Sequence, residues 1–333
     1  MPSTTLRPSR RSILKSALAT ALLGVGPLPF IAGKARAAAK EINIDFATYN
    51  PLSLVLKDQG LLEQEFAQDG TTIRWVQSLG SNKALEFLNA GSIDFGSTAG
   101  AAALIGRING NPVKVVGVYS RPEWTALVGR SDSTFASVAD LKGKKVAVTR
   151  GTDPHIFLIR ALNEAGLAES DLGIVLLQHP DGKAALLRGD VDAWAGLDPL
   201  MAQAEVESGA RLFYRNAAAN SWGVINVREA FAKENPETVK RVLAVYEQAR
   251  QWARAHPAEL KALLAKVTKL PDAVVTKQLE RTDFSNRSVT NETRQTITLA
   301  GEALQKASVI KPDVDVKATV DQLIDTQYAV AAN

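Results

Sequence analysis

Residues 76–94 read VQSLGSNKALEFLNAGSID, and residues 177–192 repeat the same pattern as LQHPDGKAALLRGDVD. Each stretch leaves an apolar strand through a glutamine, crosses a loop and enters a short helix near a Lys-Ala pair. A glycine then follows each helix, where it can adopt the left-handed conformation of a helix end. An apolar residue and an aspartate open the next strand. The shared order and spacing predict two related lobes.

Strand-like and helix-like patterns alternate on both sides of this repeat. The strand candidates are residues 42–46, 73–76, 93–95, 113–118, 126–128, 146–148, 174–177, 191–195 and 211–214. This alternation predicts an α/β protein with largely parallel, mixed sheets flanked by helices. From residue 228 the pattern becomes helical, and this tail is expected to pack onto the first lobe. Its helices are predicted over residues 239–255, 257–266, 272–280, 290–307 and 316–329.

Length and charge narrow the class of protein. A chain of 333 residues with 46% hydrophobic and 22% charged residues fits a soluble globular protein of about two domains. Residues 1–37 hold six of the 39 basic residues and none of the 35 acidic ones, so the remainder carries a charge of −2. Because no basic stripe remains outside this segment, nucleic acid is not an expected partner.

Residues 1–37 are typical of an export signal. They combine a basic start, an interrupted apolar middle at residues 17–31, and Ala35-Arg36-Ala37 as a small-x-small cleavage site. Residues 9–15, SRRSILK, resemble the twin-arginine export signature, although a general secretory signal with two adjacent arginines remains the alternative. The mature chain is expected to begin near Ala38 and to be soluble and periplasmic. Without cysteine it cannot carry a lipid-anchored N-terminal cysteine.

The sequence lacks the residues that several kinds of catalytic and metal site require. The absence of cysteine excludes disulfides, thiolate zinc sites and thiol nucleophiles. The chain has no Walker loop, no Gly-x-Ser-x-Gly elbow and no His-Glu-x-x-His motif, and its three histidines are scattered. We therefore expect a protein that is not an enzyme and that has no metal and no cofactor.

Three helix entries share one design, in which Asn or Asp precedes proline after a strand: Asn50-Pro51, Asp153-Pro154 and Asp198-Pro199. Such residues are a good N-cap and a good first helical residue, and exposed N–H groups at a helix start attract anions. Residues 96–100, GSTAG, add hydroxyls and close backbone approach, and residues 151–155, GTDPH, form the strongest single candidate. The alternative is that these caps bind nothing, or that an aspartate meets an ammonium group of the ligand.

Three tryptophans, Trp124, Trp194 and Trp222, lie near presumed strand ends or lobe crossings. They could wall the organic part of a ligand or be buried in the core, and the sequence leaves both open. His179 and His256 stand in weaker contexts than His155 and receive no role.

These residues together resemble a known family. The resemblance rests on residues 88–98 (LNAGSIDFGST), 137–147 (SVADLKGKKVA), 150–152 (RGT), 189–194 (GDVDAW) and 198–199 (DP). The mature chain is similar, nearly end to end, to periplasmic solute-binding proteins of ABC importers in the aliphatic-sulfonate, nitrate and taurine group. The aliphatic-sulfonate branch is the most similar.

The resemblance implies a type II-like periplasmic-binding-protein fold with a ligand cleft between two lobes. Residues 38–122 with 225–333 would form lobe I, and residues 123–224 lobe II. Three loops depart from patterns found in the family, at residues 49–52, 97–100 and 153–155. The ligand-binding residues implied by the family's loops and by the helix entries are Tyr49, Asn50, Ser97, Thr98, Ala99, Gly100, Trp124, Gly151, Thr152, Asp153, His155, Trp194, Asp198, Ser221 and Trp222.

The resulting hypothesis is capture of an alkanesulfonate by a monomer that then docks on an ABC importer membrane permease. Helix-start amides and the hydroxyls of Ser97, Thr98 and Thr152 would bind the anion, and the lobes would close by hinges near residues 121–124 and 220–223. Nitrate, taurine or another small organic anion is the alternative ligand. An aspartate facing the cleft, either Asp153 or Asp198, would favour taurine because taurine carries an amine.

Overall fold

The computed structural model describes residues 39–286 and 288–329, and the predicted export signal lies outside these residues. Two sheets organise the fold, with strand orders β11-β4-β10-β3-β1-β2 and β7-β6-β8-β5-β9. The first sheet contains β1 (Glu41–Phe46), β2 (Thr72–Gln77), β3 (Phe95–Ala99), β4 (Val113–Pro122), β10 (Gly223–Arg228) and β11 (Thr282–Asp283). The second contains β5 (Thr125–Gly129), β6 (Lys145–Val148), β7 (Gly173–Leu176), β8 (Ala193–Leu197) and β9 (Arg211–Tyr214).

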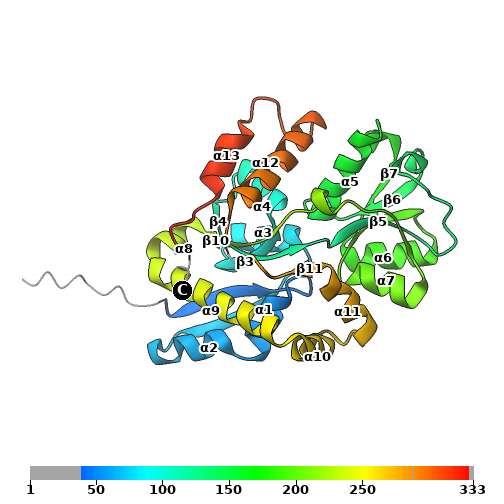
Figure 1. Cartoon of the computed structure of the whole chain (residues 1–333). Coiled ribbons are helices and arrows are strands. Elements are labelled where there is room, and N and C mark those ends of the chain that lie inside the picture. The colour runs from blue at the N-terminus through cyan, green and yellow to red at the C-terminus, as the bar shows by residue number, and fades with distance from the viewer. Residues whose placement is uncertain (1–38, 287, 330–333) are drawn as a thin grey trace, which may run out of the picture. The chain divides into compact units, whose positions relative to one another are not determined.

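Helices cover both faces of each sheet, and we call each sheet with its helices a subdomain (Figure 1). The first subdomain has α1 (Pro51–Asp58), α2 (Leu61–Phe66), α3 (Ser81–Asn89), α4 (Gly100–Ile108), α8 (Glu229–Glu234), α9 (Pro236–Ala255), α10 (Pro257–Thr268), α11 (Asp272–Glu280), α12 (Asn291–Lys306) and α13 (Val316–Leu323). The second has α5 (Asp153–Glu164), α6 (His179–Arg188) and α7 (Leu200–Ser208). None of the described helices is long and apolar enough to cross a membrane.

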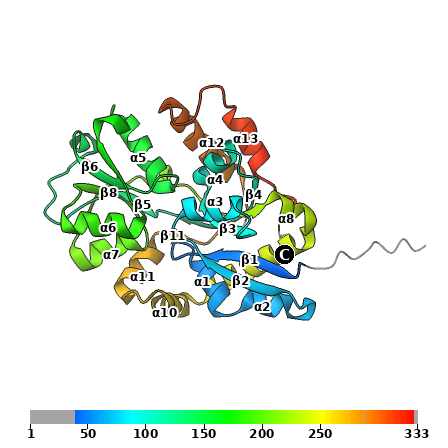
Figure 2. The same cartoon turned by 180° about the vertical axis from the view of Figure 1, so that it is seen from behind.

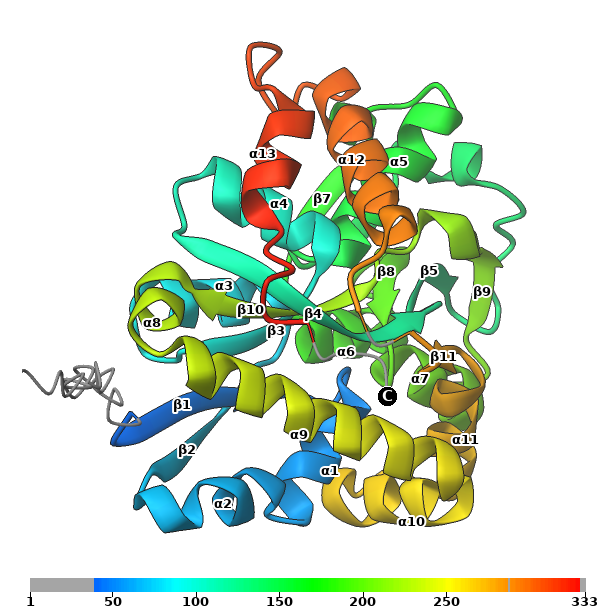
Figure 3. The ribbon, with the colours of Figure 1, turned by 60° about the vertical axis from the view of Figure 1, so that its left-hand side comes forward.

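Apolar faces of the helices build the core on each side of the sheets. In the first subdomain, α1 and α9 lie on one face of the sheet, and α3, α4 and α13 lie on the other (Figure 3). In the second subdomain, Phe157 and Leu158 of α5 pack on one face, while Leu186 of α6 and Met201 of α7 pack on the other. These contacts confirm the predicted α/β layers.

Each sheet is mixed because one strand in it follows a crossing between the subdomains. Strand β5 runs antiparallel to β8 and β9, and β10 runs antiparallel to β3 and β4. The remaining pairs of long strands, β1 with β2 and β3, and β6 with β7 and β8, are parallel. Each crossing, β4 to β5 and β9 to β10, thus supplies an interior strand that runs antiparallel to its neighbours.

The repeat in the sequence has a structural counterpart in the turns that precede β3 and β8. Gly91, just beyond the Ala90 C-cap of α3, and Gly189, the C-cap of α6, both adopt positive φ, of 68° and 83°. Each repeated aspartate then anchors the chain to a neighbouring strand, because Asp94 accepts from the Asn43 N–H at 2.9 Å and Asp192 accepts from the Lys145 N–H at 2.8 Å. Strands β3 and β8 begin after these aspartates, so they start about two residues later than predicted.

The helical tail contacts both subdomains, which extends the expectation that it packs onto the first. Helix α11 lies against α7, and α12 lies against both α4 and α5 (Figures 1 and 2). Between α11 and α12, the short strand β11 pairs with the end of β4, with Thr282 opposite Pro122. The tail therefore forms further contacts between the subdomains beside the two crossings.

Replacing Gly223 by alanine tests how closely the start of β10, after the second crossing, packs in the first sheet. A Cβ on Gly223 would lie 2.4 Å from Cζ of Tyr119, whose ring is fully buried and has no room to swing away. We expect Gly223→Ala to lower the free energy of unfolding by about 1–3 kcal/mol, measured by urea denaturation. Gly173→Ala, also at the start of a strand, is the control because its nearest neighbour would lie at 3.5 Å. Equal losses in both variants would contradict this packing argument.

Candidate functional site

Some of the predicted site residues, from both subdomains, lie where the subdomains meet. The Tyr49 ring lies edge-on to the Trp124 ring, with centroids 6.1 Å apart. A Cβ placed on Gly151 would lie 3.6 Å from Cβ of Asn82, and one placed on Gly80 would lie 3.2 Å from the His179 ring. We call this region, between the starts of α1, α3 and α4 and the starts of α5 and α6, the seam.

On the first side of the seam, a buried network holds the first predicted loop. Asp45 accepts from the backbone N–H and the hydroxyl of Ser97, both at 2.9 Å. The Ser97 hydroxyl also accepts from Asn50 Nδ2 at 2.7 Å, and the Tyr49 hydroxyl donates to the Ser97 carbonyl at 3.0 Å. Asn50 caps α1 through Ser53 N–H, as the sequence predicts. The proton of the Ser97 hydroxyl is therefore already donated to Asp45.

The other predicted hydroxyl donors also have internal partners. Thr98 Oγ1 donates to the Ala99 carbonyl at 3.0 Å and accepts from Asn226 Nδ2 at 2.7 Å. Thr152 Oγ1 donates to the Thr149 carbonyl at 2.6 Å. The segment expected to be a loop after Phe95 is instead strand, because β10 pairs with β3 as far as Ala99. In this conformation these hydroxyls cannot donate to a bound anion.

Asp153 joins both crossings to the start of α5. Its Oδ2 accepts from Trp124 Nε1 at 2.7 Å and from the Ser221 N–H at 2.9 Å, while its buried Oδ1 has no partner. Thr152, not Asp153, is the N-cap of α5, so the helix begins one residue earlier than predicted. Asp153 and Pro154 are its first two residues. Burial raises the pKa of Asp153, against hydrogen bonds from Trp124 and Ser221 that lower it.

Asp198 belongs to an ion-pair cluster between the subdomains. Both of its oxygens lie 3.4 Å from Nη1 of Arg281, and Nη2 of the same guanidinium contacts Glu205. Asp198 also accepts from the Ala202 N–H of α7 at 2.9 Å. Pro199, after a cis peptide bond, is the N-cap of α7 and not its first residue as predicted. The Asp198 carboxylate is thus neutralised within the protein.

All three tryptophans in question are placed in cores, and Trp124 lies in that of the first subdomain beside Tyr49. Trp194 is fully buried among residues of β8, α6 and α7, and its Nε1 lies against Gly182 without a partner. Trp222 packs in the first subdomain's core with Arg121 above its ring, at 5.3 Å. Gly100 and Ala101 at the start of α4 donate to the Trp222 carbonyl and to the Ser221 hydroxyl, so that helix start is also occupied.

Gly151 and His155 line an open groove of about 850 Å³ between the subdomains. The groove continues over the ends of α4 and α12 and the segment that follows α12. His155 Nε2 lies 3.1 Å from Glu169 Oε1, and this hydrogen bond lowers the pKa of Glu169. His155 therefore has a partner in its own subdomain.

Three polar residues at the seam, to which the sequence assigned no role, have buried side-chain atoms without hydrogen-bond partners. They are Asn82 Oδ1, Gln178 Oε1 and both ring nitrogens of His179. All three lie within the repeated segments, so the repeat is the signal in the sequence that points to them. Ser78, in the same segment, is buried and its hydroxyl helps to lower the pKa of Asp45.

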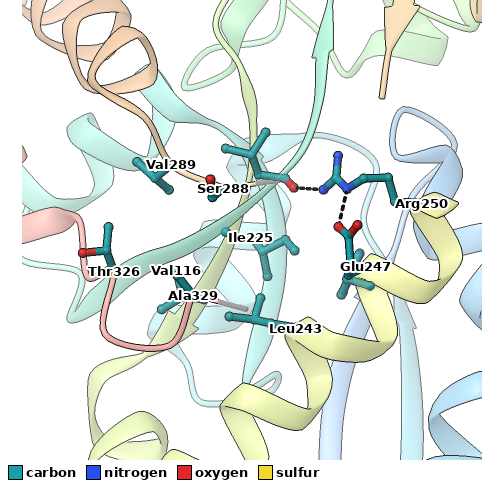
Figure 4. Close-up of a pocket in the computed structure, with 12 residues that line it drawn as sticks. Val116, Ile225, Leu243, Glu247, Arg250, Ser288, Val289, Thr326 and Ala329 are labelled. Carbon is teal, nitrogen blue, oxygen red and sulfur yellow. Dashed lines mark hydrogen bonds and ion pairs between the residues drawn. The ribbon is translucent and has the colours of Figure 1, made fainter. Parts of the chain in front are cut away.

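A pocket of about 140 Å³ lies away from the seam, between α9 and the first sheet (Figure 4). Its one cation, Arg250, is buried and donates to Glu247 at 2.9 Å, to the Phe284 carbonyl at 3.1 Å, and to the carbonyls of Val118 and Asn286. Since these partners occupy the guanidinium, this pocket does not offer a cation to a ligand. Over residues 39–286 and 288–329, no cluster of three or more His, Asp or Glu side chains could hold a metal ion.

The architecture defines the class of protein. Two mixed α/β subdomains joined by two crossings, with helix starts facing one another across a seam, form the fold of periplasmic solute-binding proteins. The chain belongs to the NMT1/THI5-like family, whose model matches residues 66–260.

Named relatives agree with this assignment. The chain is similar to a protein of Escherichia coli (strain K12) whose name is aliphatic sulfonates-binding protein. The two are 32% identical over 272 residues, which cover 81% of this chain and 83% of that protein. Among solved structures, the alkanesulfonate-binding protein SsuA from Xanthomonas axonopodis pv. citri bound to MOPS has a TM-score of 0.80 at 26% identity, covering 87% of this chain and 99% of that chain. The periplasmic aliphatic sulphonate binding protein SsuA from Escherichia coli has a TM-score of 0.74 at 27% identity, covering 89% and 95%.

Asp45 should make stability fall as pH rises. Burial raises its pKa from 3.8 to about 7, although hydrogen bonds from Ser97 lower it. Between pH 4 and 7 the unfolded chain loses this proton first, so the folded state loses on the order of 1.4 kcal/mol per pH unit from this group. Asp45→Asn keeps an acceptor for Ser97 and should flatten the decline, measured by urea denaturation from pH 4 to 8. Asp198, whose pKa burial also raises to about 7, keeps part of the slope in both proteins. Identical slopes would contradict the prediction.

Removing Arg281 should leave the buried carboxylate of Asp198 without its cation, while Glu205 keeps only Lys277, whose Nζ lies 3.7 Å from Oε1. We expect Arg281→Ala to lower the free energy of unfolding by about 3–5 kcal/mol, measured by thermal and chemical denaturation. Arg215→Ala is the control, because its ion pair with Glu123, at 2.7 Å, is half exposed and should contribute at most about 1 kcal/mol. A loss for Arg281→Ala no larger than that of the control would show that the cluster does not hold the subdomains together.

Proposed function

We propose that this protein is the extracytoplasmic solute-binding component of an ABC importer and that it captures an aliphatic sulfonate. The observation that carries the proposal is the match to SsuA bound to MOPS, which extends over 87% of this chain and includes both subdomains. MOPS carries a sulfonate group on a short alkyl chain, so it represents the proposed ligand class. The captured anion would be delivered to a membrane permease.

The two lobes of the proposal are residues 38–122 with 225–333 and residues 123–224. They would separate and close by changes in backbone angles at the crossings, near residues 121–124 and 220–223. Asp153 supports this arrangement, because one carboxylate oxygen binds a residue from each crossing. A ligand favours the closed form only if it contacts both lobes better there than in the open form.

Neutral donors are sufficient for a sulfonate. It is a permanent anion near neutral pH, and N–H groups at helix starts are suited to such a charge. Arg281, the cation beside Asp198, is already paired with Asp198 and Glu205. Recognition by amides avoids a buried, unpaired cation when the site is empty. We therefore propose that the predicted loops contribute backbone N–H groups more than side-chain hydroxyls.

Taurine remains the alternative ligand because of one observation. The Oδ1 atom of Asp153 is buried without a partner and could accept from an ammonium group. Asp198, the other carboxylate considered for this role, is paired with Arg281. The substrate test must therefore include an amine-bearing sulfonate.

The remaining parts of the proposal concern the protein in the cell. We propose that residues 1–37 direct export, by the twin-arginine route, and that the mature protein is a soluble periplasmic monomer without a lipid anchor. We also propose that it binds its ligand without catalysing a reaction, in keeping with relatives named as binding proteins.

A ligand panel tests the proposed function. Purified protein is titrated by thermal shift and calorimetry with methane-, butane- and octanesulfonate, taurine, nitrate, sulfate and a thiamine-precursor-like pyrimidine. We expect the alkanesulfonates to stabilise the protein, by about 2.7 kcal/mol at a concentration one hundred times the Kd. No response to alkanesulfonates together with a response to another compound would assign a different ligand.

A further inference from the structure

The starts of the helices at the seam differ in what occupies their N–H groups. In α1 the side chain of Asn50 accepts from the helix start, and in α4 the carbonyl of Trp222 and the hydroxyl of Ser221 do so. Helix α5 carries the carboxylate of Asp153 in its first turn, and α7 is bonded by Asp198. These four helix starts are therefore already supplied with an acceptor or an anion.

Helices α3 and α6 differ from those four. Neither has a side chain hydrogen-bonded to its N-terminal N–H groups in the described structure, and α3 has no acidic residue in its first turn. The one acidic residue in the first turn of α6, Asp181, is exposed. The two helix starts approach one another, since a Cβ on Gly80, the N-cap of α3, would lie 3.2 Å from Nε2 of His179, the first residue of α6.

His179 is the second, independent observation at this point. Its side chain is 1% exposed, and neither ring nitrogen has a hydrogen-bond partner. Nε2 and Cδ2 are the ring atoms next to Gly80, so the polar edge of the ring is directed at the start of α3. A buried polar ring whose two nitrogens both lack a partner is costly, so its placement needs a reason.

We propose that His179 and the first turn of α3 form the subsite for the sulfonate group of the ligand. A ring N–H of His179 donates to one sulfonate oxygen. The backbone N–H groups of Ser81 and Asn82, which lie in the first helical turn and have no partner within the helix, donate to the others. This subsite rests on the proposed function and makes it more specific, because it names the residue of the second lobe that binds the headgroup.

The chemistry of the ring suits this role. Burial lowers the pKa of His179 to about 3, so the ring is neutral in this conformation and offers one donor nitrogen. A hydrogen bond from a neutral donor to an anionic oxygen is stronger than one between neutral groups. Because His179 and Ser81 lie in different lobes of the proposal, an anion that binds both would hold the lobes together.

Substitution of His179 by leucine provides the test. Affinities of methane-, butane- and octanesulfonate are measured by calorimetry for the wild type, His179→Leu and His179→Gln. We expect His179→Leu to weaken all three by the same factor, about 10- to 100-fold, because the headgroup is common to them. His179→Gln retains a donor and should recover part of the affinity. The melting temperature of ligand-free His179→Leu should be unchanged or higher, since no hydrogen bond is lost.

His256→Leu is the matched control, because His256 is exposed at the junction of α9 and α10 and should leave affinity within twofold. Unchanged affinity in His179→Leu would overturn the subsite, as would a loss that grows with alkyl chain length. A large fall in the melting temperature of ligand-free His179→Leu would indicate a structural role and would also overturn it. If the wild type binds another anion of the panel and no alkanesulfonate, the proposed function fails separately, and the same comparison is made with that anion. Binding of no anion would overturn both.

Discussion

The carboxylate of Asp153 is the interaction on which the two-lobed arrangement depends. One oxygen accepts from the indole of Trp124, after the first crossing, and from the backbone of Ser221, before the second. Because Asp153 is also the first residue of α5, this contact fixes the second subdomain to both connections at once. Arg160, further along α5, donates to the Ala219 carbonyl at 3.0 Å and supports the same segment. A carboxylate is suited to this role, since one oxygen can accept from two donors that arrive from different strands.

Such internal hydrogen bonds also determine which helix starts can bind a ligand. Asn50, Asp153 and Asp198 are the residues that predicted anion sites at helix starts. In the structure their own side chains accept hydrogen bonds from the protein there, so they take the place of an external anion. Ser97 and Thr98 lie in a strand, and their hydroxyls bind Asp45 and Asn226. What remains for a ligand is the pair of seam helices whose first turns have neither a side-chain hydrogen bond nor a buried carboxylate, α3 and α6. The polar residues of the seam thus divide between those that build the interface and those left unpartnered within it.

The sequence predicted the parts of this protein that depend on local rules. The glycines after α3 and α6, the aspartates that follow them and the alternation of strands and helices all appear as expected. The extent of β3 could not be predicted, because it depends on pairing with β10, a strand more than 100 residues away. The roles of Asp198 and His179 were hidden for the same reason. Arg281, which neutralises Asp198, and Gly80, which meets His179, are brought to them only by the tertiary fold.

The unpartnered groups at the seam give closure a free-energy cost in the absence of ligand. When the lobes meet, the His179 ring nitrogens and Asn82 Oδ1 lose water and gain no protein partner. Each such group costs about 1–3 kcal/mol, whereas the Arg281 cluster and the apolar contacts of α11 and α12 favour the closed form. A ligand that satisfies the donors at the seam removes part of this cost and so shifts the equilibrium toward closure. Selectivity for an anion and the coupling of binding to closure would then have one physical origin, the burial of the His179 donor, which an anionic ligand can satisfy.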